Sequence, residues 1–205
     1  MPTWAVSRRG LFVTFEGGEG AGKSTAIIGA AHALKAQGRS VLVTREPGAG
    51  VLGAAIRALL LDSAEVTARS ELFLFLADRA NHCAQIVEPA LLRGDIVLCD
   101  RHADSTLVYQ GIVRGLDEPF VRAANTFATN GLAPDLTLLL DVPPEVGLAR
   151  LAEKNRLDRE PLQFHRRVRE GFLRLAREEP NRWRIIDATQ DSHAVLACVL
   201  AEIRP

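Results

Sequence analysis

The chain has 205 residues, of which 47% are hydrophobic and 24% are charged, and its 25 Lys and Arg residues balance 25 Asp and Glu residues. This composition is typical of one folded domain with a sizeable core, and it excludes a disordered chain. A formal net charge of zero gives no indication of a nucleic-acid partner or an anionic membrane surface, so any basic site must be local.

Cysteine and histidine usage gives no indication of a disulfide framework or a zinc site. Cys83, Cys99 and Cys198 are isolated and lack CxxC spacing, and the five histidines are scattered. No stretch of the sequence has the length and apolarity needed to cross a bilayer. We therefore expect a cytoplasmic protein with no membrane partner.

Predicted strands and helices alternate along the chain. Short apolar runs predict strands over 11–15, 41–44, 96–99, 136–140 and 184–187. Composition and periodicity predict helices over 25–37, 51–61, 70–92, 104–112, 117–129, 161–178 and at the C-terminus, with one more beginning at Pro143. This order predicts an α/β fold, in which a parallel five-stranded sheet has helices on both faces. We expect a single domain over 1–205 with a short, charged lid at about 150–160.

A glycine-rich stretch follows the first predicted strand. Residues 17–24 fit G-x-x-x-x-G-K-[ST], the P-loop motif, and a predicted helix follows. Glycines in this context allow backbone N–H groups to converge on phosphate oxygens, and the helix N-terminus adds a partial positive charge. Lys23 would reach the β- and γ-phosphates, and Ser24 would hold Mg²⁺. The residues predicted to bind the phosphates of ATP are Gly17, Gly18, Glu19, Gly20, Ala21, Gly22, Lys23, Ser24 and Thr25.

Arginines indicate a second anion site at the same edge of the sheet. Arg45 and Arg101 directly follow the second and third predicted strands, and Arg57 and Arg79 lie on the helices between them. Ligands of parallel sheets bind outside the carboxyl ends of the strands, and guanidinium groups bind phosphate bidentately. For Arg57 a solvated surface position is an equally open alternative.

One helix carries an aromatic ring and a hydrogen-bond donor at helical spacing. Phe75 and Arg79 are four residues apart and therefore share a helix face. This pair suits a flat base that carries carbonyl groups. Periodicity alone favours a different interpretation for Phe75, as part of the core-facing apolar stripe over 72–76.

An ordered set of short motifs resembles bacterial thymidylate kinases. The resemblance extends essentially from end to end and rests on the P-loop and on Thr44-Arg-Glu-Pro-Gly48, Phe75-Leu-Ala-Asp-Arg79, Asp100-Arg-His102, Tyr109-Gln-Gly111, Pro134-Asp-Leu136 and Asn155-Arg-Leu-Asp158. It implies a P-loop fold of the nucleoside monophosphate kinase type that transfers the γ-phosphoryl group of ATP to dTMP, with Mg²⁺, giving dTDP and ADP. It also implies a homodimer, to which the apolar helix around 71–76 could contribute.

The resemblance implies roles for the residues that would hold dTMP. Arg45 and Arg101 would clamp its phosphate, with Arg57 close by. Glu19 would bond the sugar 3′-hydroxyl or position the acceptor phosphate, and Tyr109 would pack against the sugar.

The same resemblance implies how the base would be recognised. Phe75 would stack on thymine, and Arg79 would donate a hydrogen bond to a base carbonyl. Thr106 and Gln110 would contact the base edge. These roles revise the interpretation of Phe75 that periodicity favours.

The positive charge near the transferred phosphoryl group is expected to come from the lid. Some thymidylate kinases carry a catalytic arginine in the P-loop, at the position that Gly20 occupies here. The resemblance therefore makes Arg156 the leading candidate for a catalytic lid arginine, beside Lys23, Glu19 and Arg101, and Arg150 and Arg159 stand behind it. A solvated charge run is the alternative for the lid.

Two other kinds of protein remain as alternatives at this point. One is a P-loop kinase for another nucleoside monophosphate or small molecule. The other is an ATP-binding regulatory module that transfers no phosphate, which would have no need for clustered acceptor arginines.

Overall fold

The computed structural model describes residues 10–62, 66–153 and 155–203. Within these ranges, five strands form one sheet in the order β2-β3-β1-β4-β5, and every neighbouring pair is parallel. The strands are β1 (Leu11–Glu16), β2 (Val41–Arg45), β3 (Ile96–Asp100), β4 (Leu136–Asp141) and β5 (Trp183–Asp187). The predicted parallel five-stranded sheet is confirmed, and each predicted strand lies within one residue of the observed bounds.

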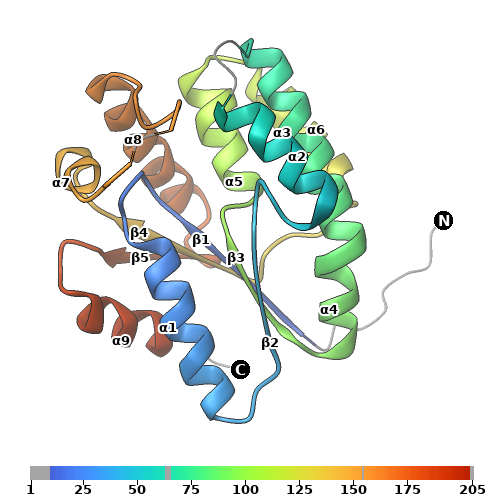
Figure 1. Cartoon of the computed structure of the whole chain (residues 1–205), viewed down its shortest axis with the longest axis vertical. Coiled ribbons are helices and arrows are strands. Elements are labelled where there is room, and N and C mark those ends of the chain that lie inside the picture. Colours follow the sequence, from blue (N-terminus) through green and yellow to red (C-terminus); the bar gives the residue numbers. More distant parts are fainter. Residues whose placement is uncertain (1–9, 63–65, 154, 204–205) are drawn as a thin grey trace.

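Helices cover both faces of the sheet (Figure 1). Those on one face are α1 (Lys23–Ala36) and α9 (Ser192–Glu202). The remaining helical segments described are α2 (Gly50–Asp62), α3 (Ala68–His82), η1 (Cys83–Val87), α4 (Glu88–Arg93), α5 (Ala103–Thr106), η2 (Leu107–Val113), α6 (Glu118–Ala128), α7 (Pro144–Ala149) and α8 (Leu162–Glu178). No helix in the described ranges is long and apolar enough to span a membrane.

The sheet is apolar because both of its faces are buried. In β1, Val13 and Phe15 join the core formed with α1 and α9, whereas Phe12 packs on the opposite face against η1 and α4. A central strand of this kind reads as a continuous apolar run, which is why the sequence predicted it well.

Two predicted helices contain segments with the wider π-helical turn. The helix predicted over 70–92 consists of α3, η1 and α4, and the helix predicted over 104–112 consists of α5 and η2. Apolar periodicity does not separate these turns from α-helix, so the prediction missed them. Such π segments are often found at functional sites, and η2 carries Tyr109 and Gln110.

The carboxyl ends of the strands lie at one edge of the sheet. The P-loop follows β1 there, Glu46 follows β2 and Arg101 follows β3. In open parallel sheets this edge is where ligands bind. The sequence positions that the motifs singled out therefore come together in space.

Candidate active site

A cavity of about 510 Å³ lies at this edge of the sheet. Its walls come from the P-loop, the ends of β2 and β3, helices α2, α3 and η2, and the lid. The predicted site residues that line it are Glu19, Gly20, Ala21, Gly22, Lys23, Ser24, Thr25, Arg45, Arg57, Phe75, Arg79, Arg101, Thr106, Tyr109, Gln110 and Arg150. The predicted residues outside its lining are Gly17, Gly18, Arg156 and Arg159.

Backbone conformation explains the glycines of the P-loop. Gly17, Gly20 and Gly22 have φ of 137°, 67° and 86°, which residues with a Cβ rarely adopt. A Cβ on Gly20 would lie 1.9 Å from the carbonyl oxygen of Gly147 in α7. The P-loop thus packs backbone to backbone against α7, and a side chain at position 20 would overlap the Gly147 carbonyl group.

Lys23 and Ser24 lie where the P-loop enters α1. The Lys23 ammonium donates to the carbonyl oxygens of Gly17 at 3.1 Å and Gly18 at 2.9 Å. Burial, together with the nearby charge of Arg101, lowers the pKa of Lys23. The amine is thus held inside the phosphate loop, next to a second cation.

The Ser24 hydroxyl donates to Oδ2 of Asp100 at 2.9 Å. A hydroxyl and a carboxylate side by side are oxygen ligands of the type that Mg²⁺ prefers, and a P-loop Ser with an Asp at the end of a strand is the usual pair in this class of site. The residues present therefore fit the ion. Asp100 has no role in the sequence-based prediction, although its place directly after a buried strand was an available signal.

Arg45 and Arg57 lie on one wall of the cavity, which we call the acceptor wall, and positive charge exceeds negative charge along it. Burial lowers the pKa of the Arg57 guanidinium, and the adjacent Arg45 lowers it further. Arg57 donates to the carbonyl oxygen of Pro47 at 2.9 Å, whereas the exposed Arg45 side chain has no hydrogen bond or ion pair within the described residues. Two neighbouring guanidinium groups that repel each other at the wall of a cavity favour binding of an anion between them.

Arg101 has a strained backbone that side-chain contacts hold in place. Its φ is 67°, although it is not glycine. Its guanidinium donates to the Gly17 carbonyl oxygen at 2.9 Å and to Glu19 Oε1 at 2.8 Å. Strain of this kind is concentrated at functional sites. The contacts direct Arg101 at the P-loop, between the two predicted anion sites.

Glu19 is the main negative charge facing these cations. It also accepts a hydrogen bond from the Tyr109 hydroxyl at 2.7 Å. Burial raises the pKa of Glu19, but the charges of Arg101 and Lys23 outweigh this effect and lower it to about 2. Glu19 is therefore ionised at neutral pH.

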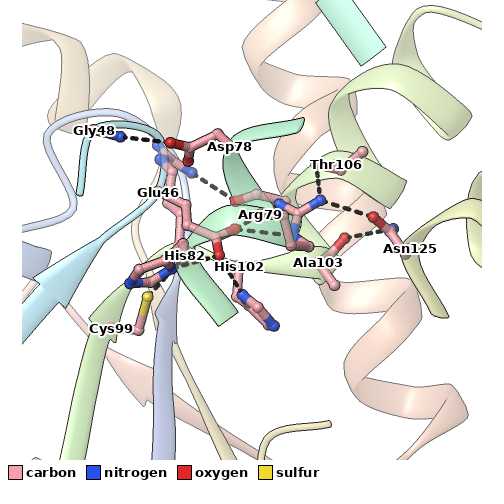
Figure 2. Close-up of polar contacts among 12 residues, drawn as sticks. Glu46, Gly48, Asp78, Arg79, His82, Cys99, His102, Ala103, Thr106 and Asn125 are labelled. Carbon is pink, nitrogen blue, oxygen red and sulfur yellow. Dashed lines mark hydrogen bonds and ion pairs between the residues drawn. The ribbon is translucent and has the colours of Figure 1, made fainter. Parts of the chain in front are cut away.

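A buried network of hydrogen bonds and an ion pair holds the side chain of Arg79, on α3, in a fixed position in the cavity wall (Figure 2). Its Nε and Nη2 both contact Oε2 of Glu46, at 2.9 and 2.8 Å, and its Nη1 donates to Thr106 and Asn125. His82 and His102 contact the other Glu46 oxygen. The sequence predicted Arg79 but missed Glu46 and Asn125, and the position of Glu46 directly after β2 was the only signal available.

Periodicity alone grouped Phe75 with the core-facing apolar stripe over 72–76, but Phe75 is not part of the core. Leu72 and Leu76 belong to the core cluster, whereas Phe75 is half-buried and lines the cavity. An aromatic face is thus available beside the locked guanidinium of Arg79.

Of the three predicted lid arginines, one lines the cavity and two lie outside its lining. Arg150 lines the cavity and donates to the Ala188 carbonyl oxygen at 3.0 Å. Arg156 instead donates to the Leu60 carbonyl oxygen at 3.0 Å and pairs with Glu71 at 2.5 Å. Arg159 is exposed, and residue 154 of the predicted lid lies outside the described residues.

A parallel sheet with a P-loop between β1 and α1, a cationic acceptor wall and an arginine-bearing lid defines a P-loop kinase of the nucleoside monophosphate kinase class. A sequence model of the family described as thymidylate kinase matches residues 15–198. The chain belongs to the thymidylate kinase family. The predicted enzyme activity, phosphorylation of dTMP to dTDP, is thereby confirmed.

Individual relatives agree with this assignment. A thymidylate kinase of Desulfovibrio desulfuricans is 54% identical over 201 residues, covering 92% of this chain and 93% of the relative. One from Thermomicrobium roseum is 51% identical over 196 residues, covering 94% and 93%. A crystal structure of thymidylate kinase from Ehrlichia chaffeensis superposes with a TM-score of 0.80 at 30% identity, covering 95% of this chain and 99% of that one.

Proposed function

We propose that ATP and dTMP meet head to head in the 510 Å³ cavity, with the ATP phosphates on the P-loop and the dTMP phosphate against Arg45, Arg57 and Arg101. The observation that carries this placement is the excess of cations on one wall. Arg45 and Arg57 line the cavity, and neither forms an ion pair with a carboxylate among the described residues. A phosphate dianion between them would supply the missing negative charge.

The nucleoside part of dTMP then extends along α3 and η2. Thymine would stack on Phe75, with Arg79 donating to a carbonyl group and Thr106 and Gln110 at the base edge. The sugar would lie against Tyr109, within reach of Glu19. This arrangement is supported by the cavity lining, to which all of these residues contribute.

The chemistry requires alignment and charge neutralisation more than proton transfer. A phosphate oxygen of dTMP is already a nucleophile at neutral pH, so no general base is needed. Lys23 and Arg101 would hold the two phosphate groups in line. Ser24 and Asp100 would hold Mg²⁺, which when bound neutralises charge on the transferring phosphoryl group.

The lid would supply the last positive charge. Arg150 lines the cavity in this structure, so it can act without breaking an ion pair to a carboxylate. Arg156, the leading candidate from sequence, would first have to leave Glu71. We therefore place Arg150 nearest the transferred group and keep Arg156 as the second candidate.

Arg45 offers the sharpest test of the acceptor site, because it has no protein partner in the described residues whose loss would disturb the fold. Removing one charge-assisted hydrogen bond costs about 1.5–3 kcal/mol, so Arg45→Ala should raise the KM for dTMP by about 10- to 100-fold. The KM for ATP should stay unchanged. Steady-state ADP release with Mg-ATP and varied dTMP measures both constants.

Arg39→Ala is the matched control, since Arg39 is also exposed but lies outside the cavity. It should alter neither KM. A rise in the KM for ATP alone on Arg45→Ala would contradict the proposed placement of the two nucleotides.

We also propose that the enzyme is a homodimer. Phe73 on α3 is 59% exposed and Leu59 on α2 is 52% exposed, and these two helices pack side by side (Figure 1). Exposed apolar side chains gathered on neighbouring helices are typical of an interaction surface. Cytoplasmic localisation stays a prediction from the sequence.

A further inference from the structure

One buried carboxylate connects the base-binding wall with the lid. Glu71 lies in the first turn of α3 and is 1% exposed. Its Oε1 accepts from Gln110 Nε2 at 2.8 Å and from Arg114 Nε at 3.4 Å, and its Oε2 accepts from Arg156 Nη2 at 2.5 Å. Two guanidinium groups thus compensate its charge, while an uncharged amide takes the side nearest the cavity.

This contact decides how the Gln110 amide is oriented. An ionised carboxylate is an acceptor only, so Gln110 has to present its NH₂ group to Glu71. The carbonyl end of the same amide, Oε1, is then directed away from Glu71. Gln110 lines the cavity, and within the described residues its Oε1 accepts no hydrogen bond. The wall therefore offers a ligand a fixed hydrogen-bond acceptor.

We propose that Glu71 is a specificity-determining positioning residue, which fixes the Gln110 amide so that the cavity accepts a pyrimidine with an N3–H group and rejects one without it. Thymine and uracil carry this N–H between two carbonyl groups, whereas cytosine has a bare N3 acceptor beside an amino group. An acceptor facing an acceptor leaves both groups unpaired in a buried site, which disfavours the cytosine nucleotide.

Arg79 lies on the same wall, and its hydrogen-bond donors also favour thymine over cytosine. Arg79 lines the cavity, and of the two N–H groups on its Nη2 only one can point at Glu46, so the other can donate to a carbonyl group but cannot accept from an amino group. A donor beside an acceptor is complementary to the carbonyl and N3–H edge of thymine. The inference rests on the proposed placement of the base beside Phe75 and Gln110.

The test compares dTMP with dCMP as phosphate acceptors. In Glu71→Gln the new amide can donate as well as accept, so the Gln110 side-chain amide is free to exchange the positions of its NH₂ group and its carbonyl oxygen. The ratio of kcat/KM for dTMP to kcat/KM for dCMP should fall by about tenfold or more, which corresponds to one mispaired buried hydrogen bond. Glu71→Asp, which keeps the charge but withdraws the carboxylate from Gln110, should lower the ratio in the same way and serves if Glu71→Gln does not fold.

Two further variants separate this role from a general disturbance of the wall. Arg156→Gln removes another partner of Glu71 but keeps the bond to Gln110, so the ratio should not change. Gln110→Leu should lower the ratio by itself, and adding Glu71→Gln to it should lower the ratio no further.

The outcomes distinguish the inference from the proposed function. If Gln110→Leu lowers the ratio and neither Glu71 variant does, the role of Glu71 is wrong and the base placement stands. If Gln110→Leu leaves the ratio unchanged, the base placement itself is wrong. If Glu71→Gln lowers the ratio equally in the wild type and in Gln110→Leu, the inference is also overturned, because the effect of Glu71 would then not depend on Gln110.

Discussion

Two residues in and beside the P-loop have an unusual backbone conformation. Gly20 and Arg101 both have φ of 67°, but for different reasons. Gly20 can adopt it because glycine has no Cβ, and a Cβ there would overlap the Gly147 carbonyl group, whereas contacts with Gly17 and Glu19 hold Arg101 there. The close packing at Gly20 also leaves no room for a side chain at this position.

Gly20→Ala tests the close approach between the P-loop and α7. The new methyl group meets the Gly147 carbonyl oxygen at 1.9 Å, and the left-handed backbone alone costs an L-residue about 1–2 kcal/mol. We expect the variant to lose at least about 2 kcal/mol of unfolding free energy, with a lower melting temperature measured without nucleotides.

Gly18→Ala is the control within the same loop. A Cβ there has no atom within 4 Å, and Gly18 is not among the glycines with positive φ. Its melting temperature should stay close to that of the wild type. Equal destabilisation by the two substitutions would show that the contact with Gly147 is not what constrains Gly20.

At the scale of elements, the lid is tied to the acceptor helices by charge. Arg156 bonds the end of α2 and the start of α3, and Glu160 pairs with Arg114 at 2.8 Å. Arg150 lies at the other end of the lid and reaches the cavity. We therefore expect the two arginines to have different roles, with Arg150 acting near the phosphates and Arg156 attaching the lid.

Alanine substitutions should separate these tasks. Arg150→Ala is expected to lower kcat by on the order of 10³, by analogy with arginine fingers, with little change in the KM for dTMP. Arg156→Ala removes a partner of the buried Glu71 and should mainly raise the KM for dTMP, by about tenfold. Steady-state kinetics with both substrates varied measures each effect. If Arg156→Ala lowers kcat by 10³ and Arg150→Ala does not, the order of candidates derived from the sequence is right.

The sequence predicted elements well and their long-range contacts poorly, for a physical reason. Apolar runs and helical periodicity report which face of a segment is buried, and the P-loop glycines report a local backbone shape. Neither reports which side chains meet across the fold. Glu46 is 33 residues from Arg79, and Glu71 is 85 residues from Arg156. The residues proposed to contact nucleotides were therefore within reach of the motifs and the family resemblance, and those that hold them in place were not.

At the scale of the whole molecule, a buried acid at the end of β1 makes stability depend on pH. Glu16 is fully buried and accepts hydrogen bonds from the backbone N–H of His102 and the hydroxyl of Ser105. Burial and the nearby Asp104 raise the pKa of Glu16 to about 7, from an ordinary value of 4.5. The folded state therefore binds a proton more tightly than the unfolded state does.

The sign of the pH effect follows from this difference. Between pH 4.5 and about 7 the folded chain holds a proton on Glu16 that the unfolded chain has lost, so unfolding free energy falls as pH rises through this window. A difference of this size corresponds to about 3 kcal/mol across the window. Glu16→Gln keeps a neutral side chain at every pH and should remove this part of the slope. We expect the free energy of unfolding, measured by urea titration without nucleotides at pH 5 and pH 8, to fall by about 2–3 kcal/mol more for the wild type than for the variant. An equal fall in both proteins would mean that Glu16 is already ionised in the fold at pH 5, held so by Arg101 and the hydrogen bonds of His102 and Ser105.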